Sequence, residues 1–278
     1  MDFNENINYD DIFKYIFLVE NLFSFITNNK SNVIQINAIL SDDKKVNICL
    51  PKLCSNNTYD RKIHNTLFRL DFIPNLEKVI ENWFEKYKIF KPLYNLYFSS
   101  INTNMYVELQ LITFTQALES YHRRLDNSNY MPKNEFEPIK KKIISCIKNN
   151  DELDKGMLDK LSSSIEYGYE YSLRKRLNLI LKGFDEDLLR VILGNFETIP
   201  IKKLNQNFVN KVVDNRNYYT HYDEDITHLS IEKLVYLNNQ LKILIEFCFL
   251  KELGFSNSEM IEIINENKQR FKVSPIYS

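Results

Sequence analysis

Four histidines are the side chains of this sequence whose ordinary pKa lies closest to neutral pH, and one of them stands near an arginine. His221 follows Arg216 by five positions, in the segment Arg216-Asn217-Tyr218-Tyr219-Thr220-His221. An imidazole can accept and donate a proton at neutral pH, and a guanidinium is a permanently charged fork that binds the oxygens of an anion. The pair therefore has the groups for proton transfer beside a phosphate, although such a spacing arises by chance roughly 0.4 times in a chain of this composition. The alternative is structural, with Arg216 capping a helix end and His221 in a loop.

The geometry of an α-helix limits what Arg216 and His221 can do together. Residues five positions apart point about 140° away from each other on an ideal helix, so one helix cannot direct both side chains at one atom. Either the helix ends between the two residues, or a second copy of the motif supplies the missing group. An apolar stripe predicts a helix from Pro200 to about Tyr219, and the acidic run at 223–225 is typical of a helix exit.

The other motifs that carry chemistry are missing or incomplete in the sequence. No glycine precedes Gly156, and the five glycines form no cluster, so there is neither a P-loop nor a dinucleotide-binding fingerprint. The four cysteines are scattered, without a second pair at the spacing of zinc ligands. Glu119 and His122 have the spacing of a di-iron ligand pair, but such a site needs two of these motifs and the chain has one. We therefore expect no metal ion and no cofactor.

The charge balance and the hydropathy restrict the partners. The 36 Lys and Arg residues against 37 Asp and Glu give a net charge of -1, so nucleic acid can bind only through a local basic patch. The basic runs at 140–142 and 174–176 either line an RNA path or are solvated faces of helices. No stretch is apolar and long enough to span a membrane, and the first residues do not form a signal peptide. These features predict a cytoplasmic protein with no membrane contact.

The elements that would position the motif are predicted from the periodicity of the apolar residues. Strands are predicted at 33–40 and 45–50, joined by a turn at 41–43, with a third strand at 67–73. Helices are predicted at 9–28, from 76 to about 87, and at 104–125, 135–148, 155–167, 169–182, 185–193, 200–219, 231–253 and 256–269. The fold is thus expected to be mostly α, with a small α+β region over residues 1–103 that holds a short antiparallel sheet, and a helical domain over 104–278.

Two segments of the chain resemble the ApeA-like HEPN family of bacterial defence proteins. The segment from Arg216 to Asp223 is similar to the R-x4-6-H signature of HEPN ribonucleases, including the polar residue after the arginine. The segment Phe114–Arg123 is similar to the first HEPN helix of ApeA-like proteins, and it follows a Trp-containing segment at 81–84, as in that family. The resemblance covers about residues 64–255. The longer β-rich N-terminal domain of the family is represented only in part.

The resemblance implies a HEPN helical bundle and an endoribonuclease that works without a metal ion, in a bacterial anti-phage defence or toxin system. Its substrate would be RNA, with tRNA as one candidate. Arg216, Asn217 and His221 would be catalytic: His221 transfers protons, Arg216 stabilises the charge on the phosphate, and Asn217 binds phosphate or holds the other two side chains. The alternative is a HEPN module that binds nucleic acid or a protein without cleaving anything.

The resemblance also implies supporting residues and partners. Glu119, His122, Arg123 and Tyr219 are expected to support the catalytic side chains. Glu119 would orient Arg216 across a helix pair or, alternatively, form only a solvated ion pair with Arg123. Because HEPN domains usually pair, we expect a homodimer through the motif-bearing helix. A further protein that neutralises or activates the enzyme is a candidate partner.

Overall fold

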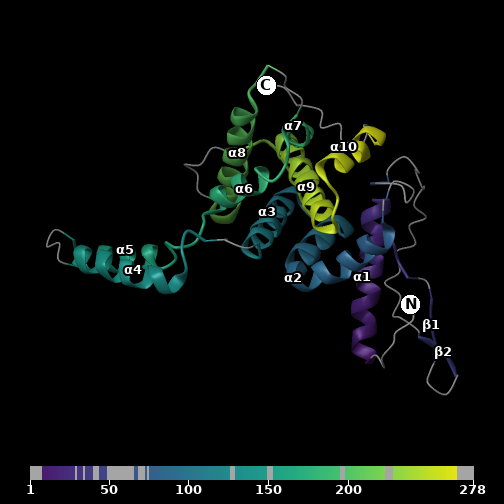
Figure 1. The fold of residues 1–278 in the computed structure, drawn as a ribbon. Coiled ribbons are helices and arrows are strands. Elements are labelled where there is room, and N and C mark those ends of the chain that lie inside the picture. The colour runs from purple at the N-terminus through teal and green to yellow at the C-terminus, as the bar shows by residue number, and fades with distance from the viewer. Residues whose placement is uncertain are drawn as a thin grey trace. The chain divides into compact units, whose positions relative to one another are not determined.

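The computed structural model of the chain describes residues 8–28, 30–33, 35–39, 44–48, 66–67, 73, 75–125, 129–148, 153–194, 198–222 and 228–267. Ten helices and two strands lie in these ranges (Figure 1). The helices are α1 (Tyr9–Thr27), α2 (Leu76–Asn102), α3 (Val107–Arg123), α4 (Lys133–Lys148), α5 (Lys155–Ile165), α6 (Leu173–Leu181), α7 (Glu186–Leu193), α8 (Ile201–His221), α9 (Ile231–Leu253) and α10 (Asn257–Glu266). The strands β1 (Ile36–Ile39) and β2 (Lys45–Ile48) pair antiparallel, with Ile36 opposite Ile48. The prediction of a mostly helical chain with a short antiparallel sheet near the N-terminus is confirmed.

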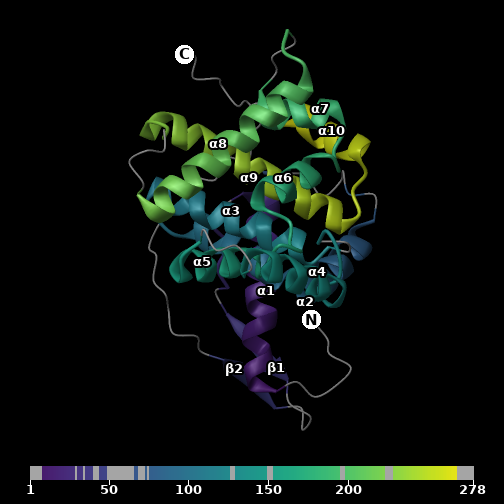
Figure 2. The same cartoon turned by 90° about the vertical axis from the view of Figure 1, so that its left-hand side faces the viewer.

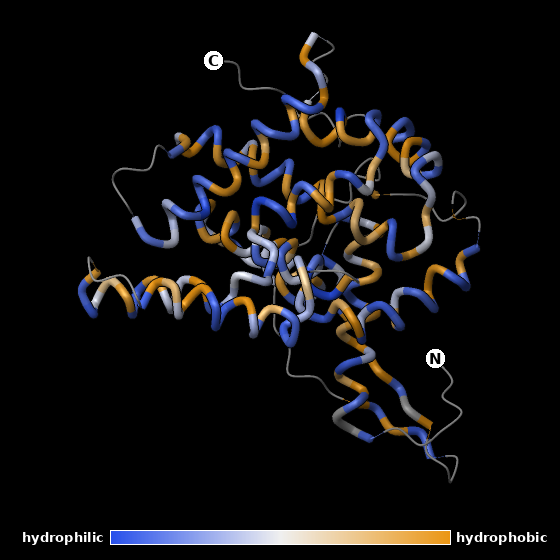
Figure 3. Tube along the Cα trace, turned by 60° about the vertical axis from the view of Figure 1, so that its left-hand side comes forward, coloured by the Kyte–Doolittle hydropathy of each residue, from blue (hydrophilic) through white to orange (hydrophobic). Residues whose placement is uncertain are grey.

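The amphipathic stripes explain why the helices form where they were predicted. Hydrophobic and hydrophilic segments alternate along the helical parts of the trace (Figure 3). In α3, for example, Leu111, Phe114, Leu118 and Tyr121 are buried, and their spacing of three or four residues keeps them on one face. The helix ends are also encoded locally. Ser256 starts α10 with a complete capping box, in which its hydroxyl accepts from the backbone N–H of Glu259.

Two helices differ from the prediction. The helix predicted to end near Tyr87 continues to Asn102, with a break at Phe90, where φ is -103° and ψ is 24°. Pro92 explains this break, since a proline inside a helix lacks the N–H that would bond to the carbonyl four residues earlier. The helix predicted from residue 169 begins only at Leu173. The hydroxyl of Ser172 accepts from the N–H of Lys175 and therefore caps the helix at that point.

The contacts divide the chain into two compact units, and neither is the simple N-terminal or C-terminal half. Among the described residues, one unit combines those up to Lys88 with those from Phe247 to Asn267, and the other contains Ile89–Glu246. The helices α2 and α9 each contribute to both units. The functional boundary expected near residue 104 stays a prediction.

The first unit has an aromatic core. Trp83 of α2 is fully buried, and its ring lies 5.8 Å from the rings of both Phe25 in α1 and Phe249 in α9. The indole Nε1 donates a 3.0 Å hydrogen bond to the backbone oxygen of Leu18, which satisfies the only polar group of this buried side chain. The expected third strand and the turn at 41–43 belong to this part of the chain, but residues 68–72 and 41–43 lie outside the described residues.

The second unit is a helical bundle that holds the Arg216–His221 motif. The helix α8 packs on α3, α6 and α7, and α3 also packs on α6 (Figures 1 and 2). The buried residues of α8 form one stripe along the helix: Leu204, Phe208, Val209, Val212, Asn215 and Tyr219. At the start of α9, the Nδ2 of Asn238 donates a 2.8 Å hydrogen bond to the backbone oxygen of Val107, which joins α9 to the start of α3. The bundle thus buries one face of α8, and the residues of the other faces are partly or fully exposed.

Candidate active site at the end of helix α8

Arg216 and His221 lie on the same helix, and the helix does not end between them. The helix α8 begins directly after Pro200 and includes both residues. It ends at Tyr222, whose backbone has φ 51° and ψ 42° and whose N–H donates a 2.5 Å hydrogen bond to the oxygen of Tyr218. Of the two arrangements that the motif allows, the first is therefore wrong. Five positions of continuous helix keep the two side chains about 140° apart.

Arg216 is half-buried, and Asn217 orients its guanidinium. The Nη1 of Arg216 donates a 3.2 Å hydrogen bond to Oδ1 of Asn217. Among the residues that the structure describes, no carboxylate lies within ion-pair distance of this guanidinium. Asn217 in turn precedes His221 by four residues, a spacing that places both side chains on the same face of the helix. Asn217 is therefore hydrogen-bonded to Arg216 and lies on the same face of the helix as His221.

His221 is the last residue of α8, and its side chain is exposed to solvent. The hydroxyl of Thr220 donates a 2.6 Å hydrogen bond to the backbone oxygen of Arg216, so it is occupied within the helix. The unpaired carbonyl groups at a helix end carry partial negative charge, which opposes the binding of a phosphate. A phosphate would bind beside His221 only with a nearby cation to offset this charge.

Aromatic rings surround the end of α8. The ring of Tyr218 stacks on that of His228, with the centroids 3.9 Å apart and the planes 9° from parallel. Tyr219 is buried on the other side, and burial raises its pKa, with a smaller contribution from the charge of Glu108 in α3. Tyr219 thus belongs to the buried face of α8, the helix that packs on α3. The supporting role expected for it stays a prediction.

The buried amide of Asn215 connects this helix end to the chain that returns after it. Its Oδ1 accepts a 2.8 Å hydrogen bond from the N–H of Leu229, and its Nδ2 donates to the backbone oxygen of Lys211. Leu229 is the direct neighbour of His228, so this hydrogen bond anchors the backbone next to the stacked ring. His228 itself is exposed to solvent in its stacked position.

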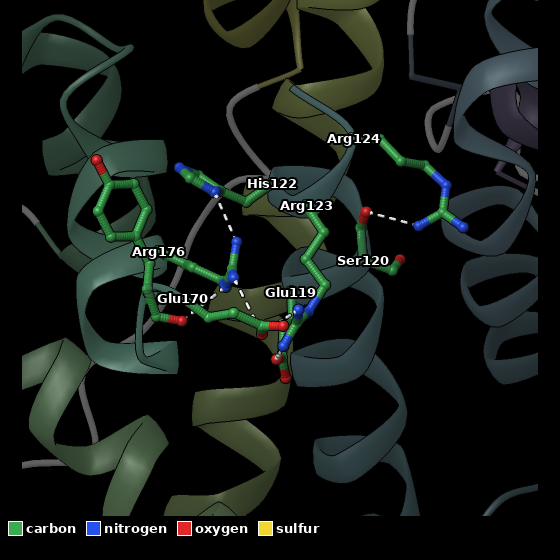
Figure 4. A network of polar contacts seen from close by, with 8 residues as sticks. Glu119, Ser120, His122, Arg123, Arg124, Glu170 and Arg176 are labelled. Carbon is green, nitrogen blue, oxygen red and sulfur yellow. Dashed lines mark hydrogen bonds and ion pairs between the residues drawn. The ribbon is translucent and has the colours of Figure 1, made fainter. Parts of the chain in front are cut away.

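The structure brings Glu119, His122 and Arg123 together in a different network (Figure 4). Glu119 Oε1 accepts a 3.0 Å hydrogen bond from Nη2 of Arg123, whose Nη1 lies 2.5 Å from Oε2 of Glu170. The fully buried Arg176 lies with its Nη2 3.8 Å from the same Glu170 oxygen. This network ties the end of α3 to the start of α6 and to the segment before it.

His122 is buried within this network beside Arg176. Its Nδ1 lies 3.4 Å from Nη1 of Arg176. Because a guanidinium can only donate, Nδ1 must accept, and the ring is then neutral with its proton on Nε2. Burial lowers the pKa of His122, and the positive charge of Arg176 lowers it further. His122 is therefore a structural histidine and not a proton carrier at the motif.

The structure shows no contact between Glu119 and Arg216 among the described residues. Glu119 pairs with Arg123, whereas the guanidinium of Arg216 bonds to Asn217. The alternative expectation, an ion pair of Glu119 with Arg123, matches the structure.

Some residues of both basic runs are paired within the protein. Arg176 is buried, so the run at 174–176 does not present a continuous basic face to RNA. The exposed Arg174 pairs with Asp214 and bonds to Asn210 on α8. In the other run, Lys140 pairs with Glu137 and with Glu166.

Sequence reasoning missed four residues that position the site or its surroundings: Asn215, Tyr218, Arg176 and Glu170. Asn215 had a usable signal. It lies seven residues after Phe208 and four before Tyr219, on the buried stripe of α8, where an asparagine must find hydrogen-bond partners. Arg176 likewise precedes Leu177 on the buried side of α6.

Among the described residues, no group of three or more His, Cys, Asp or Glu side chains could hold a metal ion. No helix in this part of the chain combines the length and the apolar character that a membrane span requires.

Comparison with protein families gives one match. Residues 112–259 match the family described as Apea-like HEPN. Searches of curated proteins and of solved structures find no match. The matched range includes all of α8 with Arg216 and His221, and it covers more than half of the 278 residues. The chain therefore belongs to the ApeA-like HEPN family.

Proposed function

We propose that the protein is an endoribonuclease that cleaves RNA without a metal ion, in the cytoplasm, as part of a bacterial defence or toxin system. Membership of the ApeA-like HEPN family makes RNA a plausible substrate, and tRNA is one candidate. The arrangement of the three motif side chains is the observation that assigns the proposed activity to specific residues. Arg216 has no carboxylate partner among the described residues, Asn217 holds its guanidinium, and His221 is exposed one turn further along the helix.

The three side chains fit the chemistry of RNA cleavage. The ribose 2′-oxygen attacks the adjacent phosphorus, the bond to the 5′-oxygen breaks, and a 2′,3′-cyclic phosphate forms. A base must take the proton of the 2′-hydroxyl, and an acid must give a proton to the leaving 5′-oxygen. His221 can carry out either transfer, while Arg216 stabilises the additional negative charge on the non-bridging oxygens.

One copy of the motif cannot supply every group. The attacking and the leaving oxygen lie on opposite sides of the phosphorus, so the base and the acid must approach from two directions. The single helix also keeps Arg216 and His221 about 140° apart. We therefore propose a homodimer through α8, in which two copies of the motif face one RNA strand. A two-fold axis near Arg216, Asn217 and His221 achieves this with one self-complementary patch.

Cleavage of RNA in the presence of a chelator tests the proposed activity. Purified protein is incubated with total RNA in EDTA, and the products are resolved on a gel. Arg216→Lys keeps the charge but loses the planar fork, so we expect cleavage to slow by about 10²-fold or more. The matched control is Arg124→Lys. Arg124 is exposed, also has no described carboxylate partner, and donates only to the backbone oxygen of Ser120.

The outcomes separate the proposal from its alternative. Cleavage by the wild type and by Arg124→Lys, with little cleavage by Arg216→Lys or His221→Ala, supports the enzyme. Cleavage that disappears in EDTA contradicts a mechanism without a metal ion. Binding of RNA by the wild type without any cleavage favours the non-catalytic HEPN module instead.

A further inference from the structure

The end of α8 carries a group of aromatic residues, half-buried at Tyr218 and exposed at Tyr222 and His228, that the cleavage chemistry does not use. Tyr218 and His228 are stacked in parallel, and His228 is exposed. The ring of Tyr222 lies 5.8 Å from that of Tyr218, at an angle of 60°. Tyr222 directly follows His221 and Tyr218 precedes it by three residues, so all these rings lie within about one helical turn of the motif histidine.

Tyr222 occupies a position where the fold itself favours another residue. Four described residues have positive φ, and three of them are of the expected types: Asn28, Gly194 and Gly254. Tyr222 is the exception, with φ 51°. A bulky side chain in the left-handed region costs free energy that a glycine or asparagine would avoid. Burial does not offset this cost, because 65% of Tyr222 is exposed. Its ring instead contacts the rings of Tyr218 and Tyr219, at centroid distances of 5.8 and 6.2 Å, and so belongs to the aromatic group at the helix end.

The stacked pair is held in place from inside the bundle. Asn215 is 2% exposed, and its Oδ1 accepts the hydrogen bond from the N–H of Leu229, next to His228. This anchor fixes the chain on which His228 lies, so the ring is positioned before any ligand binds. A pre-positioned ring binds a flat ligand with a smaller loss of conformational entropy than a mobile one.

We propose that Tyr218, His228 and Tyr222 form a base-binding platform for an unpaired nucleobase of the RNA, beside the phosphate that is cleaved. The inference rests on the proposed function, because it places the base next to the phosphate bound by Arg216 and His221. Stacking on aromatic rings is available to every base and depends little on sequence. In a duplex, the neighbouring base pairs already cover both faces of a base, so the platform selects single-stranded segments and loops.

Binding of an uncleavable RNA analogue tests the platform without requiring catalysis. The probe is a fluorescent 2′-O-methyl oligouridylate of about eight nucleotides, within the usual site size for single strands. A second probe has the same backbone with every base removed. Fluorescence anisotropy gives the dissociation constant of each. We expect the wild type to bind the first probe at least about tenfold more tightly, as stacking of one or two bases predicts.

Substitutions then test whether the aromatic rings cause the difference in affinity between the two probes. We expect Tyr222→Leu to remove most of the difference, and Tyr222→Phe to retain it, because phenylalanine keeps the ring. The matched control is Tyr167→Leu, since Tyr167 is 66% exposed and lies outside the motif. Melting temperatures confirm that each variant is folded. If Tyr222→Leu and His228→Leu both discriminate between the probes as the wild type does, the platform is wrong.

The two probes, together with cleavage of unmodified RNA, separate this inference from the proposed function. Cleavage of RNA by a wild type that binds both probes equally overturns the platform and leaves the ribonuclease intact. Discrimination between the probes by a wild type that does not cleave RNA supports the platform and overturns the ribonuclease. Failure to bind either probe and to cleave RNA overturns both.

Discussion

Asn217 accepts a 3.2 Å hydrogen bond from Nη1 of Arg216 and lies one helical turn before His221. The helix directs the arginine and the histidine to different sides, and this hydrogen bond holds the guanidinium beside Asn217. The polar residue after the arginine thus has a physical role within a single chain. It limits the positions of a long side chain that has no described carboxylate partner.

Removal of the Asn217 side chain is expected to lower kcat more than it changes KM. In Asn217→Ala the charge of Arg216 remains and still attracts phosphate, but its guanidinium loses the group that orients it. A displacement of about 1 Å in a catalytic group can reduce the rate by about 10²-fold, and we expect a loss of up to this size. Steady-state cleavage of a labelled RNA measures both constants. An increase of KM alone would show that Asn217 only binds substrate.

Asn217→Asp distinguishes orientation from charge. An aspartate keeps an acceptor for Arg216 but adds a negative charge, which pairs with the guanidinium and repels phosphate. We therefore expect Asn217→Asp to cleave more slowly than Asn217→Ala, although it holds Arg216 at least as firmly. Equal activity of Asn217→Asp and the wild type would contradict a phosphate beside Arg216.

A shared active site predicts the behaviour of mixed dimers. If two copies of the motif act on one phosphate, a heterodimer of wild-type and His221→Ala chains lacks either the base or the acid. We expect such heterodimers to lose most of their activity. Light scattering establishes the stoichiometry, and two different affinity tags isolate the heterodimer. Retention of half the wild-type activity would mean that each chain works alone.

The buried His122 predicts a dependence of stability on pH. Its pKa in the folded state lies below the ordinary value of 6.5, because of burial and the charge of Arg176. As the pH falls below about 6.5, the unfolded chain therefore binds a proton that the folded chain does not bind. The free energy of unfolding should decrease from about pH 7.5 to about pH 5.5, since unfolding is then coupled to proton uptake.

The variant His122→Asn should make this decrease smaller. An asparagine can accept from Arg176 with its Oδ1 and does not titrate. Urea denaturation of both proteins across this pH range gives the comparison, in which the other histidines cancel. Titration of Glu259 does not change the stability of the protein in this pH range. Its pKa is lowered by hydrogen bonds from Ser256, so its contribution to stability is lost only below its ordinary value of 4.5. Identical slopes for both proteins would show that His122 keeps its ordinary pKa when folded.

The sequence predicted the positions of most helices because the apolar stripes and the caps are local signals. Ser256 and Gly254 marked two helix ends, and both lie where they were expected. The length of α2 was not predicted, because the effect of Pro92 depends on whether packing of the surrounding residues outweighs one missing hydrogen bond. The start of α6 depended on the cap formed by Ser172, which competed with an apolar pattern that continues upstream.

The motif was predicted more completely than its surroundings. The types and order of Arg216, Asn217 and His221 are visible in the chain itself. The sequence offered two partners for Glu119, Arg216 and Arg123, and did not decide between them, because the spacing along α3 gives the face of a residue but not which side chains of another helix lie nearby. Asn215 and Arg176 were missed for a different reason. Hydropathy treats both as surface residues, although each lies on a buried stripe where its polar groups are satisfied.

The buried Asn215 gives the final prediction, which concerns the support of the site from within the bundle. Asn215→Ala removes the acceptor for the N–H of Leu229. Loss of a partly buried hydrogen bond of this kind typically costs about 1–2 kcal/mol, so the free energy of unfolding should fall by this amount in urea denaturation. Asn207→Ala is the matched control, since Asn207 is an exposed asparagine of the same helix and alanine is the better helix former. We expect that control to be as stable as the wild type or slightly more stable.

The same variant should also bind RNA differently. Because the segment with His228 is released in Asn215→Ala, the discrimination of this variant between base-bearing and base-free RNA should weaken at temperatures where the variant is folded. A loss of stability with unchanged discrimination would show that Asn215 supports the bundle without positioning His228.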